Sequence, residues 1–372
     1  MAVPPGEPTP GTGRVAGRVA VPAGCRDNGA MRPSPPRRAV PALLAAGLVL
    51  LPAPALAVNQ AQPEPRFPGV LLAWQADPVF LALLAGSAAL YLLGVRRVAE
   101  LHPRNPWRPG RTRAFLAGLA ALAAALLSPV ATYDGTLFSV HMVQHLLLTM
   151  VAAPLLVLGT PVSLLVRAVG RRGHRKVMRV LHSAPVRLLT HPLIAWLGFA
   201  AVMWGTHFSG IYQAALESEA VHVAEHLLYL VAAVLFWWPA IGLDPSRWRM
   251  PHPLRVGYLF MQGPVNTFLA LAIYSSGRVL YPHYASGRTW GPTPLDDQHL
   301  GGAIMWIVGD LLLLTATGLA IAAWMRNEEI VTARVDAELA AQRAARKAAA
   351  AAAQPRPDHQ DPAAGERHEP AG

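Results

Sequence analysis

Long apolar segments alternate with short polar loops over most of this chain. The length of each apolar segment is close to the ~20 residues that a membrane-spanning helix needs to cross a ~30 Å hydrocarbon core. The segments cover residues 78–95, 114–131, 138–158, 193–208, 220–243, 257–274 and 300–325. The pattern predicts an all-α fold, a polytopic membrane helical bundle with seven transmembrane helices. Pro154 and Pro264 predict kinks, which a bundle tolerates where neighbouring groups satisfy the freed backbone.

The first 57 residues differ from this pattern. Residues 1–30 are rich in Pro, Gly and Arg, and we expect a non-native or disordered leader, with translation starting at Met31. Residues 31–57 combine basic residues, an apolar run and the small-residue ending Ala55-Leu56-Ala57. This order is typical of a signal peptide, which we expect to be cleaved after Ala57. An uncleaved N-terminal anchor helix is the alternative.

The chain turns polar again after the last apolar segment. We therefore take residues 58–326 as the transmembrane domain and 327–372 as a charged tail. Residues 327–353 mix charges with an alanine run and predict an exposed helix, whereas the Pro-, Asp- and Glu-rich residues 354–372 predict disorder.

Composition supports the membrane class. Hydrophobic residues make up 53% of the chain and charged residues 14%, where a soluble domain carries about 25% charge. The mean hydropathy is +0.32. A soluble, collagen-like or wholly disordered chain is excluded. The single cysteine, Cys25, lies in the leader, so any metal site in the bundle must use imidazole, thioether or carboxylate ligands.

Charge sets the expected topology. The net charge is +11, and the basic residues gather in alternate loops, at 96–113, 167–187 and 247–255. Loops 132–137 and 209–219 contain no Lys or Arg, and the loop before the last segment has only Arg278 and Arg288. By the positive-inside rule the N-terminus lies outside and the C-terminus in the cytoplasm. No basic domain is long enough to suggest nucleic-acid binding.

The histidines are the candidate chemistry. The third segment opens with His141 and His145, and the fifth opens with His222 and His226. An i, i+4 pair lies about 6 Å apart along a helix with both rings on one face, so each pair can ligate a metal. Because both segments run inward, the pairs share one depth near the outer surface.

Two more histidines fall at the same level, since His207 ends the fourth segment and His299 begins the seventh. The candidate metal ligands are therefore His141, His145, His207, His222, His226 and His299. A hydrogen-bonded core residue is the alternative for any single one of them.

An imidazole-rich, thiolate-free site favours copper first and zinc second. Met142 and Met305 are expected to pack, although a thioether can complete a Cu(I) site. The carboxylates at this level, which are candidates to accept ring N–H groups, are Glu225, Asp296 and Asp297. Asp310 lies mid-segment, and we expect it to pair with Asn266 or Gln262, as a structural contact or as part of an ion path.

Six stretches resemble one family. They are HMVQHLL (141–147), APLLVLG (153–159), EHLL (225–228), FWWP (236–239), MQGP (261–264) and DQHLGGAIMW (297–306). In this order they resemble the CtaG family of bacterial cytochrome c oxidase assembly factors, over residues 74–325. The resemblance implies a multi-pass protein of the bacterial plasma (inner) membrane whose partners are cytochrome c oxidase subunits and copper. It implies copper ligation by His141, His145, His222 and His226 and, less firmly, by His299.

No catalytic pattern accompanies these motifs. No Ser-His-Asp order, cysteine nucleophile or H-E-x-x-H string is present, and we expect a protein that is not an enzyme. Two other classes stay open. Histidines on facing helices also ligate haem in membrane electron-transfer proteins, and a copper transporter would need a polar path across the bundle.

Overall fold

The computed structural model describes residues 62–286 and 288–353, and these form helices and loops without a β-strand. The predicted all-α class is confirmed. The expected leader (1–30), the signal peptide (31–57) and the tail segment 354–372 lie outside the described residues.

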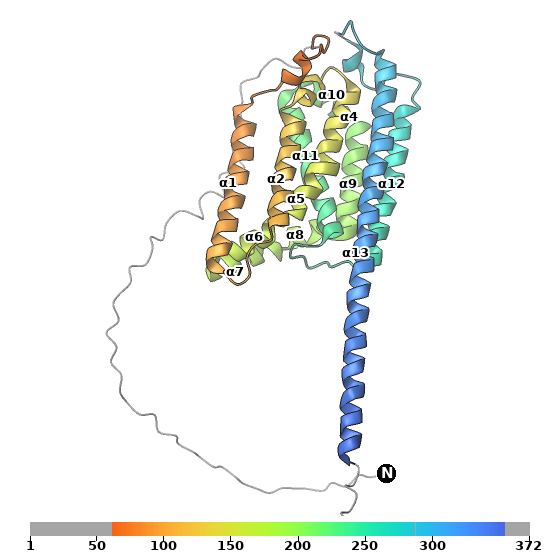
Figure 1. Ribbon diagram of the computed structural model, residues 1–372. Helices are drawn as coiled ribbons and strands as arrows, with labels where there is room; N and C mark the ends of the chain where they lie inside the picture. The colour runs from red at the N-terminus through yellow and green to blue at the C-terminus, as the bar shows by residue number, and fades with distance from the viewer. Residues whose placement is uncertain (1–61, 287, 354–372) are drawn as a thin grey trace, which may run out of the picture. The chain divides into compact units, whose positions relative to one another are not determined.

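Long helices form the bundle at the predicted positions (Figure 1). They are α1 (Pro78–Leu101), α2 (Pro109–Leu126), α4 (Phe138–Leu146) with its continuations η3 (Leu147–Ala152) and α5 (Ala153–Leu158), α9 (Pro192–His207), α11 (Glu219–Ile241), α12 (His252–Tyr274) and α13 (Pro294–Ala353). Within the described residues, six helices are long and apolar enough to cross a membrane. The number becomes seven if α9 counts as one span with α10 (Gly210–Glu217), which bends away by 67°.

Short elements connect these helices. They are η2 (Gly69–Leu72), α3 (Pro129–Tyr133), α6 (Pro161–Ala168), α7 (Arg171–Leu181), α8 (Ala184–Leu189) and η4 (Pro282–Ala285). We call the end of the bundle with α10 the α10 end and the opposite end, with α6 to α8, the α7 end (Figure 1). The basic loops lie at the α7 end, as the alternation along the sequence predicts. Which face of a membrane each end meets stays a prediction.

The predicted kink at Pro154 takes the form of a π-helical segment. Proline has no N–H to bond the carbonyl four residues earlier, and its ring crowds that carbonyl. The helix widens over η3, immediately before Pro154, instead of breaking. The carbonyl of Thr149 within η3 accepts a hydrogen bond from the Trp237 indole at 2.8 Å. The span therefore continues, and its π-helical part is held against α11.

Glycines allow α13 to lie close to α4 and α12. A Cβ atom at Gly301 would be 2.4 Å from the Phe138 ring, and one at Gly302 would be 2.9 Å from the backbone nitrogen of Tyr274. The same interface contains Asp310, which accepts hydrogen bonds from Asn266 (2.9 Å) and from Thr267. The expected pairing of Asp310 with Asn266 is confirmed.

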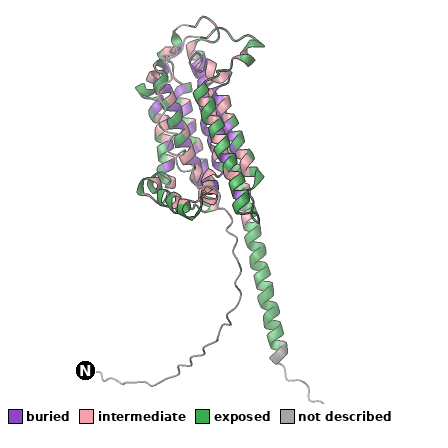
Figure 2. Ribbon diagram, turned by 90° about the vertical axis from the view of Figure 1, so that its left-hand side faces the viewer, coloured by how far each residue is buried: buried purple, intermediate pink, exposed green. Residues whose placement is uncertain are grey.

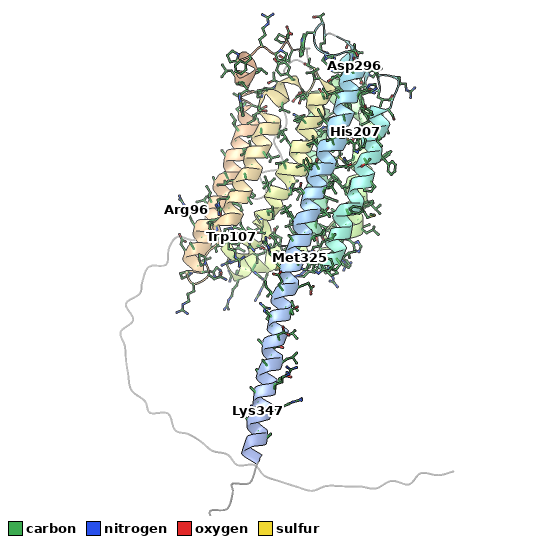
Figure 3. The ribbon with its side chains drawn as sticks, turned by 45° about the vertical axis from the view of Figure 1, so that its right-hand side comes forward. Arg96, Trp107, His207, Asp296, Met325 and Lys347 are labelled. Carbon is green, nitrogen blue, oxygen red and sulfur yellow. The ribbon has the colours of Figure 1, made fainter. Side chains whose placement is uncertain are left out.

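Helix α13 continues well past the bundle. It leaves the other helices near Met325 (Figure 3), and the side chains of residues 328–350 are exposed (Figure 2). The helix predicted for residues 327–353 is therefore present, as an extension of the last span rather than as a separate element.

Candidate metal centre

The two histidine pairs face each other inside the bundle, toward its α10 end. His141 and His145 of α4 are 0% and 3% exposed, and His222 and His226 of α11 are 6% and 8% exposed. The ring centroids lie 5.4 Å apart for His141 and His222, and 6.2 Å apart for His145 and His226. The common depth and facing direction expected from the i, i+4 spacing are thus present in the structure.

Two sets of potential ligand atoms are compact enough to hold one metal ion. In each set the atoms lie within 4.8 Å of one another, and all the residues are buried. The first set is His141, His222 and His226, and the second is His141, His145 and Glu225. His141 belongs to both, so we call these five residues together the imidazole cluster.

A carboxylate from α13 fixes the start of α4. Asp297 is fully buried and accepts hydrogen bonds from the Phe138 nitrogen (2.7 Å), the Ser139 nitrogen (3.3 Å) and the Ser139 hydroxyl (2.6 Å). The first N–H groups of a helix have no partner within it, and an acceptor there stabilises the helix start. Asp297 therefore positions the helix that carries His141 rather than accepting a histidine N–H. Asp296 is exposed and bonds Thr293.

Hydrogen bonds assign the ring protons of His141 and His145. The Tyr284 hydroxyl donates to the carbonyl of Asp134 at 3.0 Å, so it accepts from His141 Nδ1 at 3.1 Å. His141 Nε2 then carries a lone pair, and it accepts from His145 Nε2 at 2.8 Å. The Nδ1 atom of His145 is left as a buried acceptor without a partner among the described residues.

The α11 side of the cluster also holds unsatisfied atoms. His226 Nε2 donates to the Gln144 side-chain oxygen at 3.0 Å, which leaves its Nδ1 with the lone pair. His222 Nε2 is buried without a hydrogen-bond partner in the described part of the chain, and Glu225 is 2% exposed. Buried polar atoms are rarely left unpaired in this way, and several at one place indicate a site for an electron-pair acceptor.

The remaining two candidates lie differently. His207, at the end of α9, is 2% exposed, and its ring centroid is 6.0 Å from that of His145. Figure 3 shows it in the half of the bundle nearer Asp296. His299 is half-buried on α13, where it bonds the carbonyl of Ser276 at 3.2 Å and packs on Tyr274. Neither residue belongs to the two compact sets.

Several residues around the cluster are not evident from the sequence. Asp134 Oδ2 lies 3.9 Å from His222 Nε2. Burial raises the pKa of the Asp134 carboxyl to about 7. Tyr212 and Tyr229 pack on His145, with ring centroids 6.4 and 4.3 Å away. Tyr284 comes from η4, in a loop without periodicity. Their short distances to histidines arise only from the fold, so no spacing along the chain predicts them.

The family model of the cytochrome c oxidase caa3 assembly factor (Caa3_CtaG) matches residues 89–327. This chain belongs to the Caa3_CtaG family. The matched range contains α2 to α12 and the bundle part of α13, so every residue of the imidazole cluster lies in the part that defines a Caa3_CtaG protein.

Curated relatives of this Caa3_CtaG protein come from mycobacteria. It is 33% identical over 282 residues to the uncharacterized proteins Mb0105 of Mycobacterium bovis and MT0111 of Mycobacterium tuberculosis, which covers 73% of this chain and 42% of each relative. It is 29% identical over 272 residues to the uncharacterized protein ML1998 of Mycobacterium leprae, covering 71% of this chain and 41% of the relative. The chain thus spans about two fifths of these relatives. No solved structure matches it.

The donor set limits the chemistry open to this Caa3_CtaG protein. The imidazole cluster offers four neutral nitrogen ligands and one carboxylate, without a thiolate. Imidazole suits copper and zinc, whereas magnesium and calcium prefer oxygen ligands. The cluster therefore fits a borderline metal ion.

Proposed function

We propose that this protein supports the assembly of cytochrome c oxidase by holding copper in the imidazole cluster and passing it to an oxidase subunit. The observation that carries the proposal is the convergence of His141 with His222 and His226, and with His145 and Glu225, as two buried sets of ligand atoms within 4.8 Å. Family membership supplies the oxidase as partner. Copper is then the cargo of a non-catalytic protein.

The position of the cluster suits delivery on one side of the membrane. The cluster lies toward the α10 end, whose loops carry few basic residues, and the positive-inside rule assigns that end to the outer face. In the bacterial plasma membrane, this protein would therefore receive and release copper at the extracytoplasmic surface. His145 Nδ1, a buried acceptor without a hydrogen-bond partner among the described residues, supports binding, because a bound ion would satisfy it.

Copper stoichiometry in the purified protein tests the proposal. His141→Ala removes the residue shared by both sets, and His226→Ala removes a ligand of the first set only. We expect the copper held by the imidazole cluster to be lost in the first variant and to be bound more weakly in the second. His299→Ala is the matched control, because His299 bonds Ser276 outside both sets, and we expect it to bind copper as the wild type does. Unchanged stoichiometry in His141→Ala would overturn the proposal.

The structure gives less support to the two alternative classes. A drug-sized ligand needs a pocket of about 300–1,000 Å³, and the cavity that touches His145 and His207 has about 20 Å³, so haem has no room there. A transporter needs polar groups along a path across the bundle that are free to bind an ion. Asp310, the partly buried carboxylate midway along the last span, accepts hydrogen bonds from Asn266 and Thr267 at the α12–α13 interface.

A further inference from the structure

A second feature lies directly beside the imidazole cluster. It is a cavity of about 20 Å³, and four of the ten methionines of the chain line it. Met142 comes from α4, Met150 from η3, Met203 from α9 and Met305 from α13, and each is at most 7% exposed. Three helices, the continuous α4–η3, α9 and α13, thus bring methionines to one small space, which no periodicity along a single helix would produce. We call this space the methionine cavity.

A histidine with a fixed proton also lines this cavity. His207 Nδ1 lies 2.7 Å from the carbonyl oxygen of Met203, so Nδ1 must donate and Nε2 must carry the lone pair. His207 Nε2 is buried and has no partner in the described part of the chain. A metal-ligating histidine commonly donates its other ring N–H to a backbone carbonyl in this manner. His207 therefore has the protonation state and the second hydrogen bond of a ligand.

Two further acceptors line the same cavity. His145 Nδ1 and the side-chain oxygen of Gln262 are buried, and neither has a partner among the residues that the structure describes. His145 stands between the two features, since its Nε2 bonds His141 of the imidazole cluster. The methionine cavity thus offers lone pairs from three polar atoms. Its occupant must accept electron pairs or donate hydrogen bonds.

We infer that the methionine cavity binds one Cu(I) ion through His207 Nε2 and methionine thioethers. Thioether ligands select Cu(I) over divalent ions. A monovalent ion is also less costly to bury among neutral ligands than a divalent one. The volume admits one small occupant, because about 10–15 Å³ already holds a water molecule.

The methionine cavity shares His145 with the imidazole cluster, but the two sites differ in their other ligands and in metal preference. Neither compact set of the cluster contains His207 or a methionine. The inference adds a place where Cu(I) is held next to the proposed copper cargo. The inference rests on the proposed function only where it assigns both ions to copper delivery. The binding of Cu(I) in the cavity is argued from the geometry of the cavity alone.

Silver(I), a redox-stable stand-in for Cu(I), tests the inference in the purified full chain. The double variant Met150→Leu/Met203→Leu removes two thioethers at similar side-chain volume, a change that protein cores usually tolerate. We expect it to bind one Ag(I) fewer than the wild type, with unchanged Zn(II) binding at the imidazole cluster. Met261→Leu is the matched control, because Met261 is 50% exposed on α12 and does not line the cavity.

X-ray absorption on the silver-loaded protein gives a second readout. We expect sulfur ligands in the wild type and a clearly smaller sulfur contribution in the double variant, in which only Met142 and Met305 of the lining methionines remain. Equal Ag(I) stoichiometry in the two proteins, or a wild-type spectrum without sulfur, would overturn the inference and leave a water molecule as the occupant. His141→Ala separates the two hypotheses: if it retains Zn(II) and copper while the methionine variant loses Ag(I), the proposed function fails and the Cu(I) site remains.

Discussion

His141 is the residue on which the imidazole cluster depends. It supplies a ligand atom to both compact sets, and its own orientation is set by Tyr284. Because the Tyr284 hydroxyl gives its proton to the Asp134 carbonyl, it acts as acceptor toward His141 Nδ1. That arrangement keeps His141 Nε2 unprotonated and directed toward His145. A residue of a connecting loop therefore prepares a ligand on a membrane helix.

Removal of that hydroxyl should weaken copper binding without destroying the fold. In Tyr284→Phe, His141 loses the acceptor that selects its tautomer, and loss of such a partner of a ligand typically costs 10–100-fold in metal affinity. We expect a weakening of this size in a competition titration with a copper chelator, together with a loss of about 1 kcal/mol of stability for the hydrogen bond to Asp134. Tyr274→Phe, beside His299, is the control. An affinity equal to that of the wild type would show that Tyr284 does not position His141.

Depth is predictable for individual residues, whereas direction around the helix often is not. The i, i+4 spacing placed His141, His145, His222 and His226 correctly because one span fixes both the level and the face of each pair. His299 lies at the expected level, but it bonds the Ser276 carbonyl outside the cluster. Its direction was not predictable, because a single histidine has no partner one turn away to define which face of the helix it lies on. Asp134 and Tyr284 come from loops, where no period exists.

At the scale of elements, the close packing of α13 against α4 and α12 determines the positions of the histidines. Asp297 of α13 caps the start of α4. The glycines of α13 allow this helix to pack closely against α4 and α12. The helices themselves were predictable because long apolar runs have few alternatives to a membrane span. Pro154 predicted a kink in the third span, but the π-helical form of η3 and the bend between α9 and α10 were not predictable, since they result from local crowding and packing rather than from hydropathy.

Two glycines of α13 should respond to alanine in opposite directions. Gly302→Ala would place a Cβ about 2.9 Å from the backbone nitrogen of Tyr274, an atom that cannot move without shifting α12. We expect a loss of about 1–3 kcal/mol, as for other overpacked sites. Gly318→Ala meets no atom within 4 Å and should gain up to about 1 kcal/mol from helix propensity. Unfolding in mild detergent measures both, and a neutral Gly302→Ala would mean that the α12–α13 interface is looser than the structure shows.

At the scale of the whole molecule, the candidate metal sites and the basic loops lie at opposite ends of the bundle. The imidazole cluster and the methionine cavity lie toward the α10 end, and the arginine-rich helix α7 marks the other end (Figure 1). Hydrophobic burial is the same whichever way the bundle is inserted, so packing cannot fix its orientation. The loop charges alone predict it. The proposed delivery of copper at the outer surface depends on that prediction.

Accessibility of single cysteines decides the orientation. The chain has one cysteine, Cys25, so Cys25→Ser gives a cysteine-free background. Thr289, in the loop before α13, and Arg175 of α7 are both exposed. We expect a membrane-impermeant maleimide to label Thr289→Cys in spheroplasts, and Arg175→Cys only after the membrane is opened, because the basic loops stay in the cytoplasm. The reverse pattern would put both metal sites toward the cytoplasmic leaflet, where the ligand geometry would be unchanged but delivery at the outer face would be impossible.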